Sequence, residues 1–219
     1  DWAAFREVVQ LGLPIGLTML AEVSLFTGAS LLMGRLGTLE LAAHGIALQL
    51  ASLAFMIPLG LSTATTIRVG HAHGRGDRAN LSCAAITSMV LGLFIATLSA
   101  IVFLAMPHTL IGFYLDLDAE ASQTVIPYAV TFLAVAGVFQ IVDSLQALSS
   151  GALRGMRDAR IPMVIAVVSY WAIGVPVGYW LAIPAGWGGI GIWWGLAIGL
   201  AAAAVLMTIR LIAKAKQAG

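Results

Sequence analysis

Apolar residues fill six long runs along the chain, separated by short polar stretches. Each run approaches or exceeds the roughly 20 residues that an α-helix needs to cross about 30 Å of hydrocarbon. We therefore expect membrane-spanning helices at Val8–Met33, Leu41–Val69, Ala79–Met106, Gln123–Leu153, Ile161–Ile183 and Ile190–Ile212. Because polar linkers are scarce, the pattern predicts an all-α membrane protein, with residues 1–219 forming one six-helix bundle and no soluble domain.

The composition agrees with a chain whose main solvent is lipid. Hydrophobic residues make up 60% of the chain and charged residues only 10%, whereas soluble domains carry about 25% charged residues. The net charge of +1 gives no case for a nucleic-acid partner. Cys83 is the single cysteine, so no internal disulfide is expected.

The basic residues predict how the bundle is oriented. Ten of the eleven Lys and Arg residues fall at one end of the expected helices, and only Arg35 falls at the other. Cytoplasmic loops of membrane proteins carry an excess of Lys and Arg. Both ends of the chain and the loops at 70–78 and 154–160 are therefore expected to be cytoplasmic.

Small and kinking residues mark the expected helices. A stripe of glycines spaced four apart would let two membrane helices approach closely; its members are Gly174, Gly178, Gly191, Gly195 and Gly199. Among 24 glycines, some such spacings also arise by chance. Pro58 and Pro176 lie inside expected helices, where each favours a kink.

Two acidic residues lie deep in the expected membrane segments. The other eight fall at helix ends or in loops, whereas Glu22 and Asp143 lie near the middle of the first and fourth helices. A carboxylate at that depth costs about 2.5–3.5 kcal/mol on the insertion scale, so such residues usually mark an ion or substrate pathway. The alternative is that each is a protonated or hydrogen-bonded packing residue, although Asn or Gln would pack at a lower cost.

Other polar groups give weaker signals. His71 and His73 are two candidate metal ligands without a third, and the Arg-Gly-Asp at 75–77 falls at the cytoplasmic end. His44 is either a buried hydrogen-bonding residue or part of a polar cavity wall. No HExxH zinc motif and no GxSxG nucleophile elbow occur, so an enzyme is not expected.

Five stretches resemble one family of transporters. They are LGLPIGLTMLAEVSLF (11–26), LAAHGIALQLASLAFMIPLGLSTATTIRVGHAHGRGD (41–77), VDSLQALSSGALRGMRDARIPM (142–163), SYWAIGVPVGY (169–179) and GIGIWWGLAIGL (189–200). In this order they resemble the C-terminal six-helix half of multidrug and toxic compound extrusion (MATE) transporters, most closely the bacterial branch that exports norfloxacin-like drugs. The resemblance implies a twelve-helix protein in which two similar bundles face a central cavity.

The same resemblance implies a function. It predicts export of organic cation drugs across the bacterial inner membrane against an inward flow of H⁺ or Na⁺, with no cofactor. Glu22 and Asp143 match the acidic residues implicated in cation coupling and substrate release, and a Na⁺ ion would bind to them. Two departures weaken Na⁺ coupling relative to H⁺: Phe139 replaces a usual tyrosine and Gly45 a common glutamine. Phe139, Gln146, His44 and Gln49 are expected to line the cavity.

These expectations lead to two statements that can be checked. The first and fourth helices should pack so that Glu22 and Asp143 share a polar pocket with Gln146. The natural protein should be about twice as long, with the missing N-terminal six-helix half as partner of this bundle in the lipid membrane.

The main alternative is a related flippase for lipid-linked sugars or another small-molecule carrier, which would need a more basic cavity; no deep Lys or Arg is expected here. A membrane enzyme or a helical scaffold is the remaining possibility.

Overall fold

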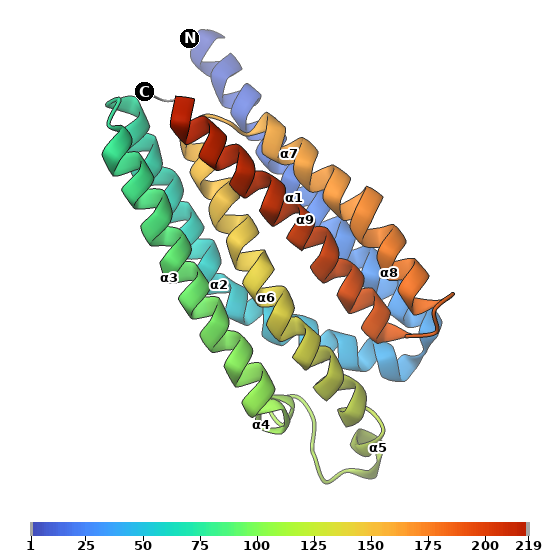
Figure 1. The fold of residues 1–219 in the computed structure, drawn as a ribbon. Helices are drawn as coiled ribbons and strands as arrows, with labels where there is room; N and C mark the ends of the chain where they lie inside the picture. The colour runs from blue at the N-terminus through green and yellow to red at the C-terminus, as the bar shows by residue number, and fades with distance from the viewer. Residues whose placement is uncertain (1, 218–219) are drawn as a thin grey trace.

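Helices account for nearly all of the regular structure (Figure 1). A computed structural model describes residues 2–217. The helices are α1 (Trp2–Leu36), α2 (Thr38–Gly74), α3 (Arg78–Ala105), α4 (Pro107–Ile111), α5 (Glu120–Gln123), α6 (Ile126–Gly155), α7 (Arg160–Val167), η1 (Val168–Gly174), α8 (Val175–Ala182) and α9 (Gly189–Gln217). Because α7, η1 and α8 follow one another without a break, the described residues contain six helical segments that are long and apolar enough to span a membrane. The six expected spans are confirmed.

The helix ends differ from the expected ones by a few residues. Most helices continue past the apolar runs: α1 starts at Trp2 and α2 ends at Gly74. The fourth expected helix starts too early, because the short α5 is separated from α6. Hydropathy marks only the membrane-embedded part of a helix, whereas backbone hydrogen bonds continue into the polar turns.

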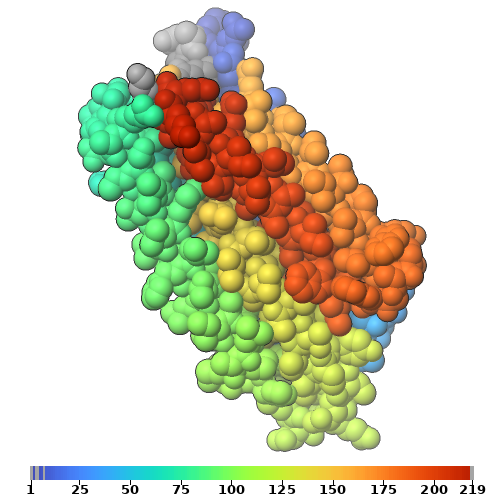
Figure 2. All heavy atoms as spheres, in the orientation of Figure 1, coloured from blue at the N-terminus to red at the C-terminus, as the bar shows by residue number. Residues whose placement is uncertain are grey.

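The helix α6 is the centre of the bundle. It packs against α2, α3 and α9, and in the space-filling view it lies between α3 and α9 (Figure 2). Buried hydroxyl and amide groups join it to its neighbours: Ser62 Oγ donates to the carbonyl of Ala147 at 2.7 Å, and Gln140 Nε2 donates to the carbonyl of Ala51 at 2.7 Å. Hydrogen bonds of this kind hold helices together in lipid, where burial of apolar surface provides little driving force between helices.

The expected glycine stripe forms a close contact between η1, α8 and α9. A Cβ atom on Gly195 would collide with the backbone of Gly178 and would lie 2.8 Å from the carbonyl oxygen of Gly174. On Gly199, a Cβ atom would lie 2.9 Å from the Cα atom of Gly174. The glycines therefore allow the two helices to touch through their backbones, as the sequence predicts.

Two helices depart from regular α-helical geometry. Figure 1 shows α2 bent near its middle, and Pro58 lies within this helix. The fifth span contains η1, a seven-residue π-helical segment that ends just before Pro176. Both prolines remove a backbone hydrogen bond, which explains why regular geometry is interrupted near them.

One end of the bundle carries most of the basic residues. The start of α1, the end of α9 and the turns after α2 and α6 lie together at this end, and α4 and α5 lie at the other (Figure 1). The six-span topology thus places the ten basic residues of the sequence analysis at the same end. We call it the basic end.

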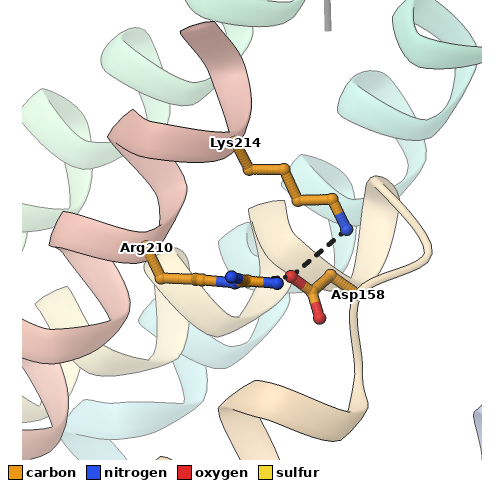
Figure 3. A network of polar contacts seen from close by, with 3 residues as sticks. All are labelled: Asp158, Arg210 and Lys214. Carbon is orange, nitrogen blue, oxygen red and sulfur yellow. Dashed lines mark hydrogen bonds and ion pairs between the residues drawn. The ribbon is translucent and has the colours of Figure 1, made fainter. Parts of the chain in front are cut away.

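An ion-pair network ties the turn after α6 to α9 at the basic end (Figure 3). Asp158, only 6% exposed, accepts from Arg210 Nε at 3.0 Å and from Lys214 Nζ at 3.2 Å on the same carboxylate oxygen. Arg210 and Lys214 are four residues apart on α9 and so project from one face of the helix. The network holds the α6–α7 turn, which closes one end of the cavity described next.

Candidate functional site

Glu22 lies near the middle of α1 and lines a cavity of about 250 Å³. The walls come from α1, α2, α6, α7 and the α6–α7 turn. The polar lining residues besides Glu22 are Thr18, Ser62, Gln146, Ser150 and Arg154. Gln146, Ser150 and Arg154 lie at three- and four-residue spacings on α6, which brings them to one face of that helix. The predicted proximity of Glu22 and Gln146 is therefore present in the structure.

Asp143 is buried one helical turn before Gln146. Its side chain is 3% exposed, and its Oδ1 atom has no hydrogen-bond partner among residues 2–217. The expectation that both acids share one pocket is wrong, because Asp143 does not line the Glu22 cavity. It nevertheless lies close enough to Glu22 for the two carboxylates to interact electrostatically. Neither acidic side chain points freely into lipid, because Asp143 is enclosed and Glu22 faces the cavity. The structure thus brings the two sequence-predicted acids together.

The two acids approach each other although their helices touch only through side chains. The expected packing of the first and fourth helices is limited to side chains: the main neighbours of α1 are α2 and α7, whereas α1 meets α6 through the edge-to-face pair Phe26 and Phe139. The Glu22 cavity occupies the space between α1 and α6. Side chains of α1 and α6 therefore approach each other across the Glu22 cavity, a space that closer packing of the two helices would fill.

Arg154 is the deep basic residue that the sequence analysis did not expect. It belongs to the last turn of α6 and lines the Glu22 cavity. Its NH2 group donates to Ser62 Oγ at 3.2 Å, and its charge attracts the Glu22 carboxylate. The Cα–Cβ bonds of a helix tilt toward its N-terminus. A long side chain at the end of α6 consequently extends back toward the membrane interior.

Tyr170 is a second residue that the sequence analysis missed. It lies on η1, is completely buried, and its hydroxyl has no hydrogen-bond partner in the described part of the chain. The hydroxyl lies within electrostatic range of both Glu22 and Asp143. Two polar residues, Ser169 and Tyr170, inside an apolar run are the signal that could have found it. Three helical segments, α1, α6 and η1, thus direct oxygen-bearing side chains toward one region.

None of the other predicted cavity residues, Phe139, His44 and Gln49, lines the Glu22 cavity. Phe139 is buried and packs edge to face against Phe26 and Trp193, with ring centroids 5.9 and 5.7 Å apart. His44 is also buried, and its Nε2 lies 3.1 Å from Ser30 Oγ. It is therefore a hydrogen-bonded core residue, the first of the two alternatives. Gln49 is exposed on α2 and does not line the Glu22 cavity.

The arrangement can hold a cation without a preformed metal centre. Across the described residues, no three His, Cys, Asp or Glu side chains gather as a metal-binding set. Glu22 and Asp143 accept no hydrogen bond from any described side chain, so their oxygen atoms are available to a ligand. Buried polar groups are normally paired, with protein or with water, because an unpaired one costs about 1–3 kcal/mol. A cation, a proton or water would supply the missing partner.

Comparisons with known proteins identify relatives of the chain. "Probable multidrug resistance protein NorM" from Agrobacterium fabrum is 51% identical over 217 residues, and its namesake from Rhizobium meliloti is 52% identical over 210 residues. These alignments cover 99% and 96% of this chain but 47% and 45% of the relatives. The chain thus spans about half the length of the curated relatives it matches. Both relatives are named for multidrug resistance.

Solved structures share the fold. The crystal structure of the eukaryotic MATE transporter AtDTX14 superposes with a TM-score of 0.86 at 26% identity, covering 99% of this chain and 49% of that one. A family model described as MatE matches residues 14–180. The match takes in Glu22, Asp143, Arg154 and Tyr170, the four residues that approach one another in the structure. The chain belongs to the MatE family.

Proposed function

We propose that this bundle is the C-terminal half of an exporter that exchanges organic cation drugs for inward-moving H⁺ or Na⁺. The observation that carries the proposal is the pair Glu22 and Asp143, two acids from different helices that approach each other in the membrane interior. Intramembrane acids are costly and usually serve ion or substrate pathways. The multidrug resistance names of relatives about 50% identical support the same function.

The pair supplies a physical basis for exchange. A cationic drug stabilises the ionised carboxylates, whereas H⁺ neutralises them and Na⁺ compensates their charge. Drug and coupling ion therefore compete for the same two groups, and the ion gradient determines which one is released on each side. Apolar cavity walls bind drugs of many shapes, because specificity comes from the few polar groups of a pocket. The range of exported drugs is therefore broad.

Neighbouring side chains affect the choice of coupling ion. Na⁺ needs several oxygen ligands, and Phe139 offers none. Tyr170 Oη is a buried and unpartnered oxygen near both acids, and it takes the place of the tyrosine oxygen that Phe139 lacks. Gln146 supplies a further amide group at the cavity.

Separate ion gradients test this proposal. The full-length protein is reconstituted into vesicles, and efflux of a fluorescent organic cation is followed under a Na⁺ gradient alone and a H⁺ gradient alone. At least one gradient is expected to drive efflux against the drug gradient. Absence of efflux under both gradients, in a preparation that binds the drug, would contradict cation-coupled export.

Arg154 bears on the alternative of a lipid-linked sugar flippase. Such a protein must accommodate phosphate groups, and the sequence analysis opposed it because no deep basic residue was expected. Arg154 removes that argument, but its charge is opposed by Glu22, and Asp143 adds a second acid near Glu22. The site thus carries more acidic than basic groups and favours a cation over a phosphate.

The proposed orientation places both ends of the chain in the cytoplasm of a bacterium, with the bundle in the inner membrane. In a Cys83→Ala background, cysteines introduced at Gly76 and Asp118 are expected to react from opposite sides of the membrane. Both positions are exposed. Gly76 belongs to the α2–α3 turn and Asp118 to the segment between α4 and α5, and these two segments lie at opposite ends of the bundle (Figure 1). Labelling of intact cells with an impermeant maleimide should modify only position 118. Modification of both positions from outside would contradict the placement.

A further inference from the structure

A second polar groove lies between α2 and α3 at the basic end, away from the carboxylates. It encloses about 360 Å³. One wall is a stripe on α2 that includes Leu61, Arg68, His71 and Arg75. These positions follow the three- and four-residue spacing of one helix face. The facing wall, on α3, is formed by Asn80, Cys83, Thr87 and Leu91.

The groove changes character along its length. Arg75 and Asn80 lie nearest the α2–α3 turn, and Leu61 and Leu91 lie deepest in the membrane segment. Its surroundings on α3 are strongly apolar, since Ile86 is 62% and Val90 64% exposed. A ligand that fills the groove must therefore be anionic and polar at one end and apolar at the other.

Neither arginine of this groove is held in an ion pair within the described chain. Arg68 and Arg75 are exposed, and neither guanidinium forms an ion pair with any of residues 2–217. The nearest acid is Asp77, which caps α3: it accepts from the backbone N–H of Asn80 at 3.0 Å and from the Asn80 amide. The side-chain and backbone hydrogen bonds to Asn80 lower the pKa of Asp77, and the charge of Arg75 lowers it further, so the ionised carboxylate attracts Arg75 from the cap without forming an ion pair with it. Two arginines remain available to an external anion.

We propose that the α2–α3 groove binds an anionic phospholipid of the surrounding membrane. The phosphate lies between Arg68 and Arg75, with His71 as a further donor, and one acyl chain follows Leu61 and Leu91. Guanidinium groups match phosphate oxygens in pairs, and basic pockets between membrane helices are a recurrent headgroup site. The charge of the two arginines selects an anionic lipid over a zwitterionic one. The apolar inner part distinguishes a lipid from a soluble phosphate.

Native mass spectrometry of the full-length protein tests the proposal. The protein is extracted from vesicles of phosphatidylcholine containing about one quarter phosphatidylglycerol, and retained lipids are counted. Arg68→Gln is expected to lower phosphatidylglycerol retention about fivefold, the effect of removing one cation at an anionic surface. Arg68→Lys keeps the charge and should retain most of the lipid. Arg78→Gln is the matched control, because Arg78 lies in the same turn region but does not line the groove.

Cys83 locates the bound lipid, since it is exposed within the groove. With any other cysteine replaced, neutral N-ethylmaleimide should modify Cys83 more slowly in phosphatidylglycerol vesicles than in pure phosphatidylcholine. This difference in the rate of Cys83 modification should disappear in the double variant Arg68→Gln/Arg75→Gln and persist in the single variant Arg78→Gln. Equal effects of Arg68→Gln and Arg78→Gln would indicate diffuse attraction and overturn the proposal. Equal protection of Cys83 by inorganic phosphate in phosphatidylcholine vesicles would overturn it in favour of a soluble anion.

Discussion

Glu22→Gln and Asp143→Asn are each expected to uncouple drug efflux from the ion gradient in the full-length protein. Each substitution keeps the size of the side chain and removes the charge for which drug and ion compete. A coupling free energy of about 1–3 kcal/mol corresponds to a loss of roughly 5- to 150-fold. The effect of Asp143→Asn should be at least as large as that of Glu22→Gln, because Asp143 is the more deeply buried of the two acids.

Efflux in vesicles and drug binding must be measured together. The variants should still bind an uncharged drug analogue and elute as folded protein, while gradient-driven accumulation falls. Glu40→Gln is a matched control, since Glu40 lies in the first turn of α2 and lines neither the Glu22 cavity nor the α2–α3 groove. Normal gradient-driven efflux in both test variants would refute a coupling role for the pair.

The hydrophobic pattern predicts the spans well because lipid imposes a simple constraint. A membrane helix must satisfy its own backbone hydrogen bonds and must be apolar over about 20 residues. The pattern also predicts the glycine contact, because Gly174 and Gly178 are four residues apart, as are Gly195 and Gly199 on the facing helix. It could not predict α4 and α5, which lie outside the apolar runs and are too short for a periodic signal.

The candidate site was only partly predictable. Glu22 and Asp143 stand out because charge is rare at that depth, but sequence spacing does not show how far a side chain reaches. Arg154 lies eleven residues after Asp143, about 16 Å along a helix, and therefore looks like a loop residue. Its side chain nevertheless extends back to Ser62 and the Glu22 cavity.

Tyr170 illustrates a different obstacle. Faces of a helix are predicted from a period of 3.6 residues, and η1 does not follow that period. Each π-helical turn contains an extra residue, so the face presented by Tyr170 and all that follow is rotated relative to the prediction. Such segments occur frequently at functional sites. Here η1 directs the Tyr170 hydroxyl toward the acids while α8 keeps Gly178 against α9.

Gly195→Ala is expected to destabilise the bundle more than any other single methyl addition along the glycine stripe. The new Cβ atom would collide with the Cα and N atoms of Gly178, which belong to a backbone that cannot rotate away. Overpacking of this kind typically costs about 1–3 kcal/mol. Gly178→Ala should cost less, because its Cβ atom would lie 3.3 Å from the Cα atom of Gly195 and a small shift would accommodate it.

The thermal stability of these variants is compared by heating the full-length protein in detergent and measuring how much monodisperse protein remains. Gly60→Ala makes the same substitution in α2, where nothing lies within 4 Å of the added atom, and helix propensity favours Ala over Gly by up to about 1 kcal/mol. The expected order of stability is therefore Gly60→Ala first, then Gly178→Ala, then Gly195→Ala. Because α8 continues directly from η1, separating α8 from α9 should also displace Tyr170 and reduce coupled efflux. If Gly195→Ala and Gly60→Ala lost half of their monodisperse protein at the same temperature, close packing of α8 on α9 would not be what stabilises this part of the bundle.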